Sequence, residues 1–120
     1  MFMTQFDLEE RTCQFAIAVR EFLKSIPVTP ANTEYQKQLI RSSASISANY
    51  LEANDALGNK DFLMRIRIAR KEAKETYFWL RLLDLTQKSD LTNPRLNLMK
   101  EAKELRLILS SIINKTQSKL

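Results

Sequence analysis

The chain of 120 residues contains one glycine and three prolines, although turns between strands draw heavily on both residue types. An all-β fold needs a turn about every 8 to 12 residues, so this composition argues strongly against one. A single glycine also excludes a Walker A loop and a GxGxxG dinucleotide turn, each of which needs several glycines. Neither a β-sandwich nor a nucleotide-loop architecture is therefore expected.

Histidine is absent, and Cys13 is the only cysteine. These counts exclude the usual structural zinc sites, disulfide frameworks and nucleophile schemes that depend on a histidine base. We therefore expect a protein that is not an enzyme and that uses no metal, cofactor or small-molecule substrate. The lone thiol, together with the lack of a signal sequence and of a long apolar run, predicts a cytoplasmic protein with no membrane contact.

Helix-breaking residues divide the chain into four helical segments within one domain, residues 1–120. Asp7, with an acidic residue three positions later, is the predicted start of a capping box, and Pro27 and Pro30 end the first segment. Gly58 separates the second segment from the third, and Asn93 precedes a proline as in a helix start. The expected helices cover residues 7–26, 33–57, 60–87 and 94–114.

Two segments carry an apolar seam with heptad spacing. In the third segment the seam is Phe62, Ile66, Ala69, Ala73, Thr76, Leu80 and Leu83, and in the fourth it is Leu98, Ala102, Leu105, Leu109 and Ile112. The apolar anchors of the second segment extend to Leu57, and its run of small residues from Ser42 to Ala48 favours a close helix crossing. The pattern predicts an all-α fold, an antiparallel up-down four-helix bundle.

Positive charge is concentrated in the second half of the chain. Residues 59–120 carry fourteen basic and seven acidic side chains, a net charge of +7, whereas residues 1–58 carry five and seven. On a helical wheel, five basic residues of the third segment form a ridge away from the core: Lys60, Arg67, Lys71, Lys74 and Arg81. This ridge is the candidate nucleic-acid-binding surface, and a solvated face that keeps the protein soluble is the alternative. Only Phe78 interleaves with it, which argues against a base-stacking platform.

A second apolar stripe lies beside the seam of the third segment. It consists of Ile68, Trp79 and Leu82. One interpretation is a broader core within the chain. The other, slightly favoured, is an oligomer interface, because the stripe also carries charge that would pair across a symmetric contact.

Four carboxylates on the second and third segments form a further cluster: Glu52, Asp55, Glu72 and Glu75. A di-iron bundle would require histidines as well, and a general acid–base pair would require a nucleophile or a substrate clamp. Ion pairing is therefore the favoured role, with partners among Arg41, Arg65 and Arg70.

Two stretches resemble the signatures of one family. Residues 38–52, QLIRSSASISANYLE, are similar to a Q-L-R-R-A-A start followed by S-I-x-x-N-x-x-E-G. Residues 71–83, KEAKETYFWLRLL, are similar to a K-E-A-x-E-T-x-x-W-L element. Together the stretches resemble the 23S rRNA intervening-sequence proteins over residues 8–110. Two departures are Ser42, at the second basic position, and Ala53, at the glycine position.

The resemblance implies an up-down four-helix bundle that forms a ring-like homo-oligomer, often a pentamer, with no transferable catalytic activity. Family members are encoded in insertions in bacterial large-subunit rRNA genes or elsewhere in the genome, and a distantly similar bundle of retroelements binds nucleic acid. The motif residues, to which the resemblance gives structural rather than catalytic roles, are Arg41, Asn49, Glu52, Glu72 and Glu75.

The leading hypothesis is a non-enzymatic oligomeric bundle that binds RNA or a ribonucleoprotein through the basic faces of the third and fourth helices. The alternative is a protein–protein adaptor with no nucleic-acid role. An enzyme is the least supported class.

Overall fold

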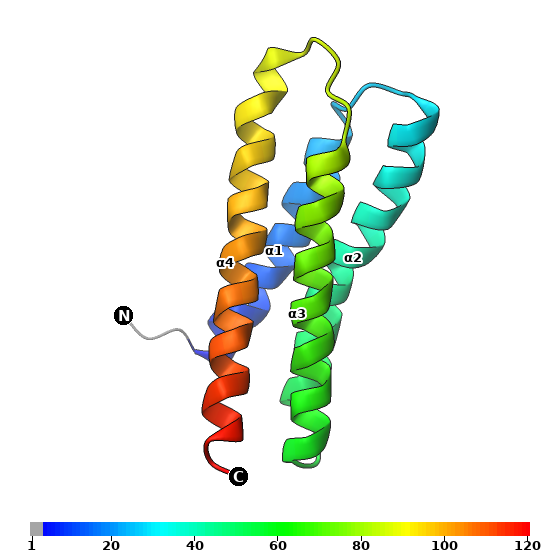
Figure 1. Cartoon of the computed structure of the whole chain (residues 1–120). Coiled ribbons are helices and arrows are strands. Elements are labelled where there is room, and N and C mark those ends of the chain that lie inside the picture. Colours follow the sequence, from blue (N-terminus) through cyan, green and yellow to red (C-terminus); the bar gives the residue numbers. More distant parts are fainter. Residues whose placement is uncertain (1–3) are drawn as a thin grey trace.

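The computed structural model describes residues 4–120, which form four long helices and one short 3-10 turn. Their bounds are α1 Gln5–Leu23, α2 Pro30–Asn54, α3 Asn59–Leu82, η1 Ser89–Leu91 and α4 Thr92–Gln117. The helices run alternately up and down, so the chain is an antiparallel bundle (Figure 1). The predicted fold class is thereby confirmed.

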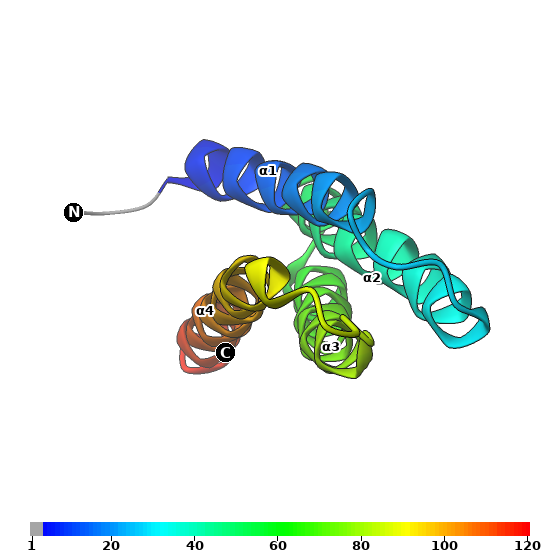
Figure 2. The ribbon, with the colours of Figure 1, turned by 90° about the horizontal axis from the view of Figure 1, so that it is seen from above.

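Helix α3 packs between α2 and α4, and α1 completes the bundle by contacting α2 and α4. Seen from above, α1 and α2 are inclined to the pair formed by α3 and α4 (Figure 2). The molecule is elongated, with extents of 50 × 29 × 20 Å. This arrangement gives α3 two packed flanks, one toward α2 and one toward α4.

The heptad seam of α3 forms the middle of the core. Its positions from Ile66 to Leu83 are buried, and Phe62 is half-buried against the same cluster. The seam of α4 is also internal, although Ile113 rather than Ile112 is the buried residue at its lower end. The prediction that Leu57 anchors the core is wrong, because this side chain is fully exposed beyond the end of α2.

The run of small residues in α2 contributes to the contact of α2 with α3. Ser42 and Ser43 are buried. The Ser42 hydroxyl accepts a hydrogen bond of 2.8 Å from Thr76 of α3, and Ser43 donates one of 2.7 Å to the carbonyl of Leu39. Because these side chains are short and their hydroxyls are satisfied, the two helices can approach without leaving a buried polar group unpaired. The predicted close crossing is confirmed.

The first two helices begin earlier than expected because threonines cap them. Thr4, not Asp7, is the N-cap of α1: its hydroxyl accepts a hydrogen bond from the amide of Asp7, and the Asp7 carboxylate accepts one from the amide of Thr4. Asp7 therefore closes the capping box from its far side. The hydroxyl of Thr29 caps α2 by accepting a hydrogen bond of 3.0 Å from the amide of Asn32, which places Pro30 in the first turn of α2 rather than in the loop.

The third helix ends at Leu82, five residues before the predicted Gln87, because tertiary hydrogen bonds hold the following backbone. The side chain of Asn32 is fully buried. It donates a hydrogen bond of 2.8 Å to the backbone carbonyl of Asp84 and accepts one of 2.9 Å from the backbone amide of Asp84. Arg95 donates 2.7 Å to the carbonyl of Leu83. A left-handed turn at Thr86, with φ of 55°, then redirects the chain toward α4.

The fourth helix begins at Thr92 and ends at Gln117, so it is longer at both ends than the predicted 94–114. The 3-10 turn at residues 89–91 leads directly into it. Asn93 therefore lies inside the first turn and is not the N-cap, whereas Pro94 is accommodated there because the first turn needs no amide donor.

Asn32 joins the loop between α1 and α2 to the loop that follows α3, because its side-chain amide also donates a hydrogen bond of 2.9 Å to the backbone carbonyl of Pro27. We expect Asn32→Ala to lower the free energy of unfolding by about 2–3 kcal/mol, since it leaves buried backbone groups unpaired. Urea denaturation followed by circular dichroism measures this change. Asn97→Ala is the matched control, because Asn97 is exposed on α4. Equal midpoints for the two variants would contradict the role assigned to Asn32.

Candidate nucleic-acid interface

A groove between α3 and α4 is lined by basic side chains from both helices. One hollow in it, of about 420 Å³, is bordered by Arg67, Arg70, Lys71, Lys74, Arg106, Leu107 and Ser110. A second hollow, of about 200 Å³, is bordered by Ala73, Lys74, Tyr77, Ala102, Lys103 and Arg106. Lys74 and Arg106 border both hollows, so the two adjoin one another. We call the combined feature the α3–α4 groove.

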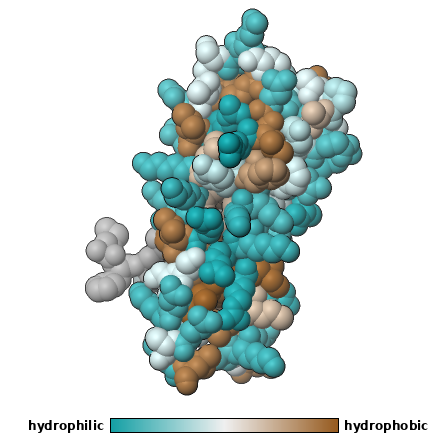
Figure 3. Space-filling view, in the orientation of Figure 1, coloured by the Kyte–Doolittle hydropathy of each residue, from teal (hydrophilic) through white to brown (hydrophobic). Residues whose placement is uncertain are grey.

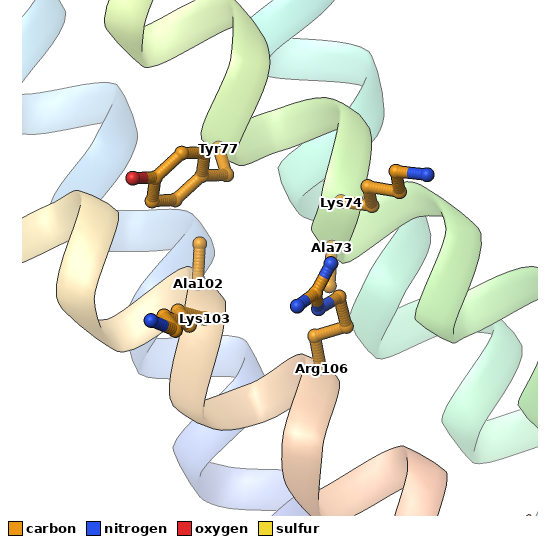
Figure 4. Close-up of a pocket in the computed structure, with 6 residues that line it drawn as sticks. All are labelled: Ala73, Lys74, Tyr77, Ala102, Lys103 and Arg106. Carbon is orange, nitrogen blue, oxygen red and sulfur yellow. The ribbon is translucent and has the colours of Figure 1, made fainter.

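Small residues in the two helical seams create the depth of this groove. Ala73 of α3 and Ala102 of α4 are fully buried, and both border the smaller hollow. Figure 4 shows Tyr77 reaching from α3 to a place near Ala102, and Arg106 reaching from α4 toward Ala73. Arg70 crosses the groove and donates a hydrogen bond of 3.4 Å to the hydroxyl of Ser110. The face that carries α3 and α4 is largely hydrophilic through its middle (Figure 3).

The cations of the groove have no carboxylate partner. Within residues 4–120, no carboxylate oxygen lies within 4.0 Å of the charged nitrogens of Arg67, Arg70, Lys71, Lys74, Lys103 or Arg106. The carboxylates of α4, Glu101 and Glu104, instead bind Arg11 of α1 at 2.7 and 2.8 Å. A cluster of cations without counter-charges produces a positive local potential that attracts polyanions.

The predicted basic ridge is divided by the structure. Arg67, Lys71 and Lys74 line the α3–α4 groove. Lys60 is exposed in the first turn of α3, and Arg81 borders a different hollow formed with the loop between α3 and α4. The basic surface is therefore a groove shared by two helices rather than a ridge along one. Nucleic-acid binding by these residues stays a prediction.

Four charged or aromatic residues of the groove were not assigned to it from the sequence: Tyr77, Lys103, Arg106 and Arg70, which was expected to pair with a carboxylate and instead contacts Ser110. The expectation that only Phe78 interleaves with the basic residues is wrong, because Tyr77 lines the groove together with Lys74. A signal was present, since Tyr77 is three residues after Lys74, a spacing that places both on one helical face. Lys103 and Arg106 have the same spacing on α4.

The second apolar stripe of α3 is only partly exposed. Trp79 is half-buried against the core, with its ring centroid 6.1 Å from that of Tyr35 on α2 and 5.2 Å from that of Phe78. Ile68 is also half-buried, whereas Leu82 is 38% exposed. Trp79 therefore takes part in α2–α3 packing within the chain, and an oligomer contact through Ile68, Trp79 and Leu82 stays a prediction.

Two further searches concern metals and membranes. From Thr4 to Leu120, no three metal-ligating side chains come together at one point. Over the same stretch, none of the helices combines the length and the apolar character that crossing a lipid bilayer demands.

Comparison with known proteins identifies the family. The family model described as 23S rRNA-intervening sequence protein matches residues 4–111. The chain belongs to this family. A crystal structure of a protein of unknown function from the S23 ribosomal protein family of Bacteroides thetaiotaomicron VPI-5482 is similar, with a TM-score of 0.72 and 29% sequence identity. The similarity covers 88% of this chain and 96% of that one. No curated protein matches.

The residues that carry the intervening-sequence family motif lie mainly at the contact of α2 with α3. Arg41 of α2 binds Glu72 at 2.9 Å and Glu75 at 3.4 Å. The carbonyl oxygen of the Asn49 side chain accepts a hydrogen bond of 3.4 Å from Arg65. Glu52 is exposed. The expected ion pairing is confirmed for Arg41, and the family motif residues on α3 join two helices of one chain.

Burial has the largest effect on the pKa of Glu72, whose side chain is only 9% exposed. Burial raises the pKa of Glu72 above its ordinary value of 4.5, and the positive charge of Arg41 partly opposes this rise. The unfolded chain therefore releases the proton at a lower pH than the folded chain. The contribution of protonated Glu72 to the free energy of unfolding is fully present below about pH 4.5. It is lost as the pH rises through the pKa of Glu72 in the folded chain.

We expect Arg41→Met to lower the free energy of unfolding by about 1 kcal/mol at pH 7, and by less at pH 4, where Glu72 is protonated. The modest size follows from the exposure of Arg41, whose side chain is 53% accessible. Denaturant midpoints at the two pH values measure the difference. Lys37→Met, which removes an exposed ion pair with Glu34, is the control. An equal loss at both pH values would refute the account of Glu72.

Proposed function

We propose that this protein binds RNA without catalysing a reaction, and that the α3–α4 groove is the binding surface. The observation that carries the proposal is the set of six cations that converge on the groove from two helices with no carboxylate partner among the described residues. Bringing these charges together is electrostatically unfavourable in isolation, and a polyphosphate backbone relieves the repulsion while releasing its own counterions.

Two further observations support RNA as the polyanion. The second half of the chain, which supplies both walls of the groove, has a net charge of +7. The family name refers to sequences that intervene in 23S rRNA, and the similar crystal structure is assigned to a family named for a ribosomal protein. One of these names mentions 23S rRNA and the other the ribosome, which supports RNA as the class of polyanion.

The groove predicts a specific response to charge reversal. The triple variant Arg67→Glu, Lys71→Glu and Lys74→Glu should bind a labelled 20-nucleotide RNA at least about 100-fold more weakly at 0.1 M salt. The slope of log affinity against log salt should fall by about 2, since each lost contact to a single strand contributes about 0.7. Fluorescence anisotropy at three salt concentrations measures both quantities, after circular dichroism has shown equal helicity.

A charge-matched variant is the control for this experiment. Lys88, Lys115 and Lys119 are exposed and lie outside the α3–α4 groove, so changing all three to glutamate alters the net charge equally. The proposal requires the control to retain most of the affinity. Equal losses in the two triple variants would show that binding depends on net charge alone.

We also propose that the protein assembles as a homo-oligomer. The support is the apolar surface that the bundle leaves uncovered on the outer side of α3, where Leu82 is 38% and Phe78 49% exposed. Exposed apolar side chains grouped on one helix are characteristic of contact surfaces.

Size-exclusion chromatography with light scattering, run after RNase treatment, tests the assembly. The wild-type mass should be a multiple of 14.0 kDa, and Leu82→Arg should lower it. Leu96→Arg, which alters an exposed leucine of α4, should leave the mass unchanged. A wild-type protein that elutes as a 14.0 kDa monomer would contradict assembly.

A protein–protein adaptor is the second candidate function. It is favoured by a largely apolar hollow between α1 and α2, on which Ile17, Ile40, Ala44 and Leu51 converge. A surface of this kind suits the apolar face of a partner helix. A monomeric wild-type protein without RNA affinity would favour this candidate over the RNA-binding bundle.

A further inference from the structure

The smaller hollow of the α3–α4 groove combines an aromatic ring with positive charges. Tyr77 forms one wall, Ala73 and Ala102 form an apolar floor, and Lys103 and Arg106 lie along α4 (Figure 4). The volume of about 200 Å³ is small, less than the roughly 300 Å³ at which pockets for drug-sized molecules begin. The hollow is thus suited to one flat group of limited size rather than to an extended ligand.

Among the side chains that the structure describes, those of Thr4 and of residues 7–120, no aromatic ring pairs with that of Tyr77. The ring pairs of the described chain are Tyr35 with Trp79 and Phe78 with Trp79. Tyr77 is 36% exposed, so the ring is accessible from the groove. An accessible aromatic face flanked by cations is the combination that single-stranded nucleic-acid sites use, in which bases stack on rings and the backbone follows the charges.

An RNA duplex cannot use such a hollow. In an A-form helix the bases are stacked on one another, and their faces are not available to a protein side chain. The cations of the larger hollow, by contrast, are able to contact the phosphates of either a duplex or a single strand. The two parts of the groove therefore differ in what they recognise.

We propose that the Tyr77 hollow binds one unpaired nucleobase, with Lys103 and Arg106 beside the adjoining phosphates, so that the protein selects single-stranded over duplex RNA. This inference rests on the proposed function and names the class of RNA that the groove binds. Stacking on Tyr77 supplies the selectivity, and the cations supply the affinity common to both forms of RNA.

The test compares two probes, a 12-nucleotide oligouridine and a 12-base-pair RNA duplex, by fluorescence anisotropy at 0.1 M salt. Tyr77→Leu should weaken oligouridine binding by about tenfold, within the range measured for single stacking contacts, and leave duplex binding unchanged. Its salt slope should equal that of the wild type, because stacking releases no counterions. Tyr77→Phe, which keeps the ring, should bind like the wild type.

Leu96→Ala is the control, since Leu96 is an exposed apolar residue of α4 that lines neither hollow of the groove and lies outside the proposed oligomer surface. Its oligouridine affinity should remain within about twofold of the wild type. Unchanged oligouridine binding in Tyr77→Leu, or an equal loss for the duplex, would overturn the base-binding hollow. If the triple variant Arg67→Glu, Lys71→Glu and Lys74→Glu still loses RNA affinity when the Tyr77 test fails, RNA binding by the groove is retained and only the base-binding hollow is rejected. If the wild type binds neither probe, both proposals fail.

Discussion

The separation of charge on the two flanks of α3 determines both how this helix is joined to α2 and where the bundle carries unpaired positive charge. On the α2 flank the carboxylate of Glu72 is buried and held by Arg41. On the α4 flank α3 presents cations, while the carboxylates of α4 turn away to bind Arg11 of α1. Three acidic groups, Glu72, Glu101 and Glu104, are therefore used in contacts that hold the helices together, while six unpaired cations gather in the α3–α4 groove.

The packing of α3 against α4 determines the shape of the groove in which these cations lie. In the seam of α3 the large residues Ile66 and Leu80 flank a stretch that contains Ala69 and Ala73, and Ala73 borders the smaller hollow together with Ala102 of α4. A larger residue at either position would fill the hollow beside Tyr77. The same small residues that let α3 and α4 pack closely thus leave room for a ligand, so the stability of the bundle and its candidate function depend on one part of the core.

The fold follows from the sequence because its signals are local and periodic. The heptad spacing from Ile66 to Leu83 identifies the buried positions, and small residues mark the α2–α3 crossing. The end of α3 could not be derived, because it depends on Asn32, which is 52 residues from Asp84. The groove was missed for a similar reason: a wheel drawn for one helix shows a ridge, whereas Lys103 and Arg106 reach Tyr77 only through tertiary packing.

The most direct test of RNA binding at the α3–α4 groove is site-specific crosslinking with an RNA that contains 4-thiouridine, followed by mass spectrometry of the crosslinked peptides. This measurement locates the contact without any change to the protein and does not depend on its oligomeric state. The account predicts crosslinks within residues 67–77 of α3 and 103–107 of α4. Crosslinks confined to α1 and α2, at the apolar hollow near Ile40, would contradict it.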